Sequence, residues 1–370
     1  MSARLWAFVP LAWLVAAGCG KSGGGRAGSD ASAGGATGEG GADLGQGGTG
    51  GASSGTGGDA EAGATGSDAA ADRADAQADV EPDGSTDWSV AACRRCTAYA
   101  PPVKVATGGV AALDSLSGLA VSRAQPDIIF MHNDRDRPVV YALDLQGRAL
   151  AQITLTGAGA TDSDFEDIAI GPCGAANCVF LGDIGDNNAR RTEYAVYRFL
   201  LPTVPTTPGN TTMTPAYDRF AFVYEDGSHN AEGLMVSPDG TIYVVTKVAP
   251  GTGGRVPATG PSSVYRLPPS MTTATKVATL SVPTGTDLAA SAAAAHPCGL
   301  GFILRTYDKV YEFTVPPGEG FEASFTTTPQ VVAMPDEPQS EGIDYRADGL
   351  GFITSGEGVG APIVETLCAP

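Results

Sequence analysis

The sequence predicts an all-β protein, and within that class a β-propeller built from four-stranded antiparallel blades. After residue 88 no long segment shows the 3.6-residue periodicity of a helix, short apolar runs alternate with turn residues, and one strand pattern recurs along the chain. A four-stranded unit cannot bury both of its faces alone, so such units pack side by side, as propeller blades do. A β-sandwich is the alternative fold.

The recurring unit opens with a short apolar strand that begins at a small or acidic residue. It appears as S-G-L-A-V-S from Ser117, E-D-I-A-I-G from Glu166, E-G-L-M-V-S from Glu232, D-L-A-A-S from Asp287 and E-G-I-D-Y from Glu341. A tight turn, a second strand, a polar loop and a third strand follow, and a more variable fourth strand closes most units. Five copies favour five blades, with six as the alternative.

The end of the chain predicts how the ring closes. The last unit finishes after its third strand, near Cys368, whereas an unassigned strand around Val103, P-V-K-V-A, precedes the first unit. We expect this N-terminal strand to complete the last blade.

The N-terminal quarter predicts an exported, lipid-anchored protein. Residues 1–18 combine Arg4, an apolar run and small residues before Cys19, as in a lipoprotein signal peptide. Cys19 is the predicted lipidation site, with ordinary signal cleavage as the alternative, and Gly20 after it favours the outer membrane of the cell envelope. Residues 19–88 are rich in Gly, Ala, Ser and Asp and predict a disordered tether. Residues 89–370 then form the propeller.

The charge of the chain limits its partners. The net charge is −19 and the pI about 4.4, which argues against nucleic acid, since binding phosphate requires clustered basic residues. We expect a monomer that contacts the bilayer only through its lipid anchor and offers an acidic face to an unknown ligand or protein.

Chain direction predicts where this acidic face lies. The starts of the first strands and the loops after the second strands meet at one end of a propeller, around the central channel. The predicted metal ligands there are Glu166, Asp167, Asp183, Glu232 and Glu341. The rest of the predicted ligand-binding face comprises His132, Asn133, Asp134, Asp186, Asn187, Lys247, Asp287, Arg305 and Glu357. Hard oxygen ligands favour Ca²⁺.

Two structural alternatives compete with this metal hypothesis. Asp183, Asp186 and Asn187 have the composition of Asx turns. The carboxylates at the strand starts could instead accept hydrogen bonds from backbone N–H groups of neighbouring blades.

Several motifs resemble a known group of proteins. H-N-D-R-D, F-E-D-I-A-I-G, G-D-I-G-D-N-N-A-R-R, L-R-T-Y and S-E-G-I are similar to those of secreted bacterial β-propeller lipoproteins of undefined activity, distantly like the phytase-like ("esterase-like activity") propellers. The resemblance runs from about Leu116 onward and implies a propeller with a calcium-bearing channel. The chain lacks the D-A-D-D-P-A type signature and the dense basic cluster associated with propeller phytases.

The cysteines predict three disulfides. Seven cysteines minus Cys19 leave six, an even number in an exported protein. Cys173 and Cys178 bracket one turn and form the first predicted pair. We expect Cys368 to pair with Cys93 or Cys96 and Cys298 to take the other; a four-cysteine zinc cluster is the alternative.

No motif specifies a reaction. The chain has three histidines without zinc-protease spacing, and no serine lies between a strand and a helix as a nucleophile elbow does. The sequence therefore predicts a surface-anchored, non-enzymatic binding or scaffold module. A calcium-dependent hydrolase of phosphate esters or glycans is the alternative.

Overall fold

The computed structural model describes residues 94–134, 137–159, 163–247, 261–270, 272–282, 289–332 and 334–370. The predicted signal peptide, the tether and the lipidation site at Cys19 lie outside these ranges. Within them every regular element is a strand except one 3-10 helix, η3 (Phe321–Thr326). None of the described helical segments is long or apolar enough to span a membrane.

The strands form antiparallel sets in chain order. The first set is β2 (Leu116–Val121), β3 (Ile128–Asn133), β4 (Val139–Asp144) and β5 (Ala149–Thr154). The second is β6 (Phe165–Cys173), β7 (Ala176–Asp183), β8 (Tyr194–Leu200) and β10 (Asp218–Tyr224). The third is β11 (Ala231–Val236), β12 (Ile242–Thr246), β13 (Ser263–Leu267) and β14 (Thr273–Thr279). The fourth is β15 (Ala290–Ala295), β16 (Gly301–Thr306), β17 (Val310–Thr314) and β18 (Gln330–Val332).

The last sheet joins the two ends of the described chain. It contains β19 (Ser340–Tyr345), β20 (Gly351–Gly356), β21 (Pro362–Leu367) and β1 (Val103–Thr107), with β1 antiparallel to β21. Two outer edges are also covered. β9 (Thr211–Met213) adds to β5, and β10 pairs with β14, both in parallel, so the second and third sets form one eight-stranded sheet.

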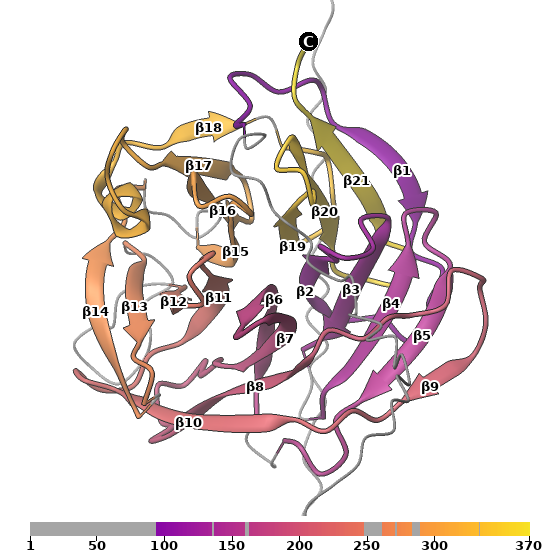
Figure 1. Ribbon diagram of the computed structural model, residues 1–370, viewed down its shortest axis with the longest axis horizontal. Helices are drawn as coiled ribbons and strands as arrows, with labels where there is room; N and C mark the ends of the chain where they lie inside the picture. The colour runs from indigo at the N-terminus through magenta and orange to yellow at the C-terminus, as the bar shows by residue number, and fades with distance from the viewer. Residues whose placement is uncertain are drawn as a thin grey trace, which may run out of the picture. The chain divides into compact units, whose positions relative to one another are not determined.

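The first strand of each set lies innermost. β2 packs against β6, β6 against β11, β11 against β15, β15 against β19, and β19 against β2, which closes a cycle of contacts. Figure 1 shows these strands around the centre and the later strands of each set farther out. This arrangement is a β-propeller. The core lies between neighbouring sheets, where Phe130 and Val140 pack with Ile168 and Leu181, so both faces of the inner strands are buried.

Every inner strand carries a β-bulge at its second residue. The pairing register skips that residue in β2, β6, β11, β15 and β19. The skipped residues, called the bulge ring below, are Ser117, Glu166, Glu232, Ser291 and Glu341. A bulge releases its residue from the ladder and turns its side chain.

One register prediction was wrong. The sequence pattern assigned Asp287 to the start of the fourth inner strand, but β15 begins at Ala290 and its bulge residue is Ser291. The alanine run has no distinctive side chains to fix its register. Asp287 itself lies outside the described residues.

Two of the predicted disulfides are confirmed. Cys173 pairs with Cys178 across the β6–β7 turn, and Cys96 pairs with Cys368. The second bond ties the segment before β1 to the end of β21. Cys298 is also disulfide-bonded, and its expected partner Cys93 lies outside the described residues.

Candidate functional site

The bulge ring opens into a pocket at one end of the channel, called the mouth below. Ser117, Glu166, Glu232 and Glu341 line this space of about 120 Å³. The other lining residues come from the surrounding loops and strand ends: Leu116, Asp134, Asn187, Lys247, Tyr307, Gln339 and Glu357. Three inner strands therefore each contribute a glutamate, as chain direction predicted.

One side of the mouth gathers three carboxylates. Oxygens of Asp134, Asp164 and Glu166 all lie within 4.8 Å of one another, a spacing that a metal ion could bridge. Glycine at position 185 makes this approach possible, because a Cβ there would collide with the carboxylates of Glu166 and Asp164. Ser117 Oγ donates to the backbone carbonyl (2.5 Å) and to Oε2 (3.1 Å) of Glu166, which fixes that side chain.

Two of these carboxylates, Asp164 and Glu166, have raised pKa values. Burial raises the pKa of Asp164 to about 7, with a further contribution from Asp134. Burial, followed by the charges of Glu232, Asp164 and Asp134, raises the pKa of Glu166 well above its ordinary value. Crowded like charges disfavour ionisation unless a cation neutralises them.

Another part of the mouth is built on an ion pair between the buried Glu232 and the half-buried Lys247. Lys247 Nζ contacts Glu232 Oε1 at 2.7 Å and donates to Tyr307 Oη at 2.8 Å. Asn230 Nδ2 donates to Glu232 Oε1 (3.3 Å) and to Asn187 Oδ1 (3.2 Å). Burial alone would lower the pKa of Lys247, but Glu232 and Tyr307 raise it above its ordinary value.

The third glutamate, Glu341, accepts a hydrogen bond from a neutral side chain of the described residues. Gln339 Nε2 donates to Glu341 Oε1 at 3.2 Å. Burial, with the charge of Glu232, raises the pKa of Glu341 to about 8. Ser291, the bulge residue of β15, is fully buried, and its Oγ has no hydrogen-bond partner among the described residues.

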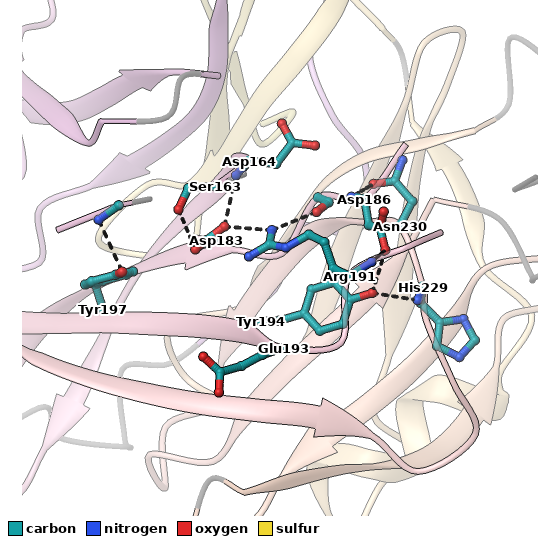
Figure 2. Close-up of polar contacts among 12 residues, drawn as sticks. Ser163, Asp164, Asp183, Asp186, Arg191, Glu193, Tyr194, Tyr197, His229 and Asn230 are labelled. Carbon is teal, nitrogen blue, oxygen red and sulfur yellow. Dashed lines mark hydrogen bonds and ion pairs between the residues drawn. The ribbon is translucent and has the colours of Figure 1, made fainter. Parts of the chain in front are cut away.

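Asp183 lies behind the three carboxylates. It forms an ion pair with Arg191 (2.7 Å) and accepts hydrogen bonds from the backbone N–H of Asp164 (2.9 Å) and from Ser163 Oγ (3.0 Å). Figure 2 shows these contacts converging on its carboxylate. Asp183 therefore positions Asp164, and its oxygens are outside the three-carboxylate group.

Asp186 has the structural role that the sequence analysis gave as the alternative to metal binding, because its carboxylate accepts hydrogen bonds from a turn. Its oxygens accept the backbone N–H groups of Arg190 (2.9 Å) and Arg191 (2.8 Å), and Tyr194 Oη donates to it at 2.9 Å. Asn230 Oδ1 accepts the backbone N–H of Asp186 at 2.6 Å (Figure 2). This network fixes the loop from which Asn187 reaches the mouth.

Asp167 also has a structural role. Its carboxylate accepts the N–H groups of Ile168 and Leu234 (both 2.8 Å) and of Ala293 (3.3 Å). One oxygen thus accepts a backbone donor of β6 itself and the other accepts donors of β11 and β15, which agrees with the structural alternative.

Besides Asp186, three other described residues expected on the ligand-binding face do not line the mouth. His132 is fully buried, and burial lowers its pKa to about 4. Asn133 Nδ2 donates to the carbonyl of Ala112 at 2.5 Å and so holds a loop. Arg305 is fully buried, donates to the carbonyl of Gly342, and forms an ion pair with Glu337. By contrast, Asp134, Asn187, Lys247 and Glu357 do line the mouth.

Sequence reasoning overlooked several residues of the site. Asp164 had a usable signal, because it lies two residues before Glu166 and alternate residues of an extended chain share a face. Tyr307 and Gln339 follow a strand and precede one, respectively, without a motif to distinguish them. Asn230 has no distinguishing motif either, because its role depends on contacts with Asp186 and Asn187, which are distant in the sequence.

No protein-family model and no curated protein match the chain. Among solved structures, the PQQ-bound aldose sugar dehydrogenase from Streptomyces coelicolor aligns with TM-score 0.42 and 13% identity, over 72% of this chain and 96% of that one. Virginiamycin B lyase from Staphylococcus aureus with quinupristin gives 0.35 and 12%, over 69% and 66%. The Dos1 propeller gives 0.33 and 11%, over 67% and 58%. These similarities carry no information on activity.

Proposed function

We propose that the protein is a surface-anchored lipoprotein whose five-bladed propeller binds a divalent cation, calcium, at the mouth and uses the acidic face around it as a binding module. One observation carries the cation site: the oxygens of Asp134, Asp164 and Glu166 lie within 4.8 Å of one another. Asp134 comes from the loop after β3, whereas the other two precede or begin β6. A cation there would hold two blades together.

The donor chemistry favours calcium over the softer metals. The described residues that line the mouth include no histidine and no cysteine, which zinc and copper prefer. Carboxylate, amide and hydroxyl oxygens suit a hard cation that accepts six to eight ligands. A bound Ca²⁺ would also replace the protons that the crowded carboxylates otherwise retain.

The blade number and the closure belong to the same proposal. Five inner strands that contact one another in a cycle, and the pairing of β1 with β21, support five blades closed by the N-terminal strand. The disulfide between Cys96 and Cys368 reinforces that junction. Anchoring rests on the lipoprotein pattern before Cys19, and Cys19→Ser should abolish palmitate labelling and membrane fractionation.

Calorimetric titration of the purified whole chain with CaCl₂ tests the cation site. We expect binding in wild type and at least a tenfold loss of affinity in Asp164→Asn and Glu166→Gln. Asp218→Asn, which removes an exposed carboxylate paired with Arg198, serves as the control. Because Asp164 ionises beside Asp134 only above its pKa of about 7, Asp164→Asn should also raise the melting temperature of the calcium-free protein at pH 8. Unchanged calcium affinity in both variants would refute the proposal.

A further inference from the structure

A second cavity lies at the opposite end of the channel, where the inner strands finish. It measures about 160 Å³ and is called the exit cavity below. Its walls come from the ends of β6, β11 and β15, from the start of β7, and from the turns that follow β2, β11 and β15. The lining residues are Arg123, Ile170, Gly171, Pro172, Asn177, Val236, Pro238, Ala295, His296 and Pro297.

Most of this wall is apolar, and its one formal charge is held in place. Arg123 Nη1 donates to the carbonyl of Tyr345 (2.8 Å), and Nη2 pairs with Asp344 Oδ1 (3.0 Å). Arg123 lines the exit cavity, whereas Asp344 does not. The oxygens of Asp344 also accept the backbone N–H groups of Val121 and Tyr345. The cavity therefore meets the positive member of this pair.

The other two polar side chains in the wall, His296 and Asn177, are uncharged near pH 7. His296 Nδ1 accepts the backbone N–H of Cys298 at 3.1 Å, which assigns the ring proton to Nε2. Burial, with the charge of Arg123, lowers the pKa of His296 to about 4, so the ring is neutral near pH 7. Nε2 lies against Gly349, which is not part of the cavity wall. Asn177 adds a side-chain amide.

The exit cavity and the mouth differ in the charges of their lining residues, and this difference indicates the charge of the ligand that the exit cavity would bind. The lining of the exit cavity includes no carboxylate in the described part of the chain, whereas the mouth is lined mainly by acids and amides. In a chain of net charge −19, a largely apolar cavity with one guanidinium and no acid is a distinct environment. Small-molecule sites combine apolar walls with a few fixed polar groups in this way.

We propose that the exit cavity binds a small monocarboxylate with an apolar body of about the size of benzene. A cavity of about 150 Å³ accommodates benzene, and apolar side chains provide the surface against which such a body packs. The carboxylate is recognised by Arg123, with Asn177 as the second donor. This site is independent of calcium, because it lies at the other end of the channel.

Ligand-observed NMR on the whole calcium-free chain tests this proposal, with benzoate as the probe and benzyl alcohol as its uncharged counterpart. We expect benzoate to bind wild type more tightly than benzyl alcohol does. Asn177→Asp places a negative charge in the wall and should weaken benzoate about tenfold, while benzyl alcohol changes less than about twofold. Ala295→Leu fills the cavity and should abolish binding of both probes.

Melting temperatures of the two variants report whether the fold is retained. The proposal is overturned if benzoate does not bind wild type at millimolar concentration. Equal affinity for benzoate and benzyl alcohol would also overturn it, as would benzoate binding that neither variant alters.

Discussion

The carboxylate of Asp167 accepts the backbone N–H of Leu234 at 2.8 Å, so a side chain of β6 supplies the acceptor for a donor of β11. The same oxygen is 3.3 Å from the N–H of Ala293 on β15. Inner strands of neighbouring sheets cannot form a ladder with one another, because their edges converge on the channel. Asp167 thus supplies acceptors that no strand provides.

Replacing Asp167 with asparagine should destabilise the propeller by about 1 to 3 kcal/mol, because the amide offers one acceptor oxygen where two accept N–H groups now. Urea unfolding of the two proteins measures the difference. Asp218→Asn removes an exposed acid and should change stability by less than about 0.5 kcal/mol. An Asp167→Asn protein as stable as wild type would contradict this role.

The disulfides Cys96–Cys368 and Cys173–Cys178 should differ in their effects on stability. Cys96 and Cys368 are 272 residues apart, whereas Cys173 and Cys178 are 5 apart. Chain-entropy reasoning gives about 5 to 6 kcal/mol for the long loop and about 2 for the short one, because the long loop restricts the unfolded chain more. Denaturant unfolding of the two double Cys→Ser variants measures this ranking, and equal losses would contradict it.

Stability of the calcium-free protein should fall between about pH 5 and 8. Folding raises the pKa of Asp164 to about 7 and that of Glu341 to about 8, from values near 4 in an unfolded chain. The folded state binds these protons more tightly, so the stability that they contribute at low pH is lost as the pH rises through the folded pKa values.

Calcium should reverse this trend, because it neutralises the ionised carboxylates. Melting temperatures at pH 5, 6, 7 and 8, with calcium or with chelator, provide the measurement. We expect the stabilisation by calcium to grow with pH. A calcium effect that is the same at pH 5 and pH 8 would argue against carboxylate ligands of raised pKa.

Lys247→Gln should have opposite effects on the stability of the calcium-free protein and on its affinity for calcium. It leaves Glu232 without its cation, which is expected to destabilise the calcium-free protein by about 1 to 3 kcal/mol. The added negative potential should strengthen calcium binding severalfold. Titration calorimetry and urea unfolding check the two effects, and weaker calcium binding would contradict the prediction.

Much of the fold was predictable because short stretches of the sequence determine its strands and turns. The strand pattern recurs with valine-tyrosine pairs in the third strands, such as Val140-Tyr141 in β4 and Val310-Tyr311 in β17. The cysteines that bracket a turn predicted their own bond. The alanine run of β15 failed as a guide, because a strand of identical small residues fits several registers equally well.

The site was less predictable, because an acid looks the same in sequence whatever its partner. Glu166 and Asp167 are adjacent, yet one side chain lines the mouth and the other accepts backbone N–H groups. The bulge decides between them, and it is a property of pairing rather than of composition. Arg305 was expected to face the ligand, but its partner Glu337 comes from a loop that carried no signal.

The bulge ring makes the chemistry of the mouth independent of the scaffold. Because the pairing register skips the ring residue of each inner strand, exchanging serine for glutamate there leaves the paired residues of the ladder as they are. The number of charges around the channel can therefore be changed one bulge-ring residue at a time, either during evolution or by protein engineering. Ser291 is the ring position that carries no carboxylate and whose hydroxyl has no hydrogen-bond partner among the described residues, and Glu232 and Glu341 are the ring acids outside the three-carboxylate group.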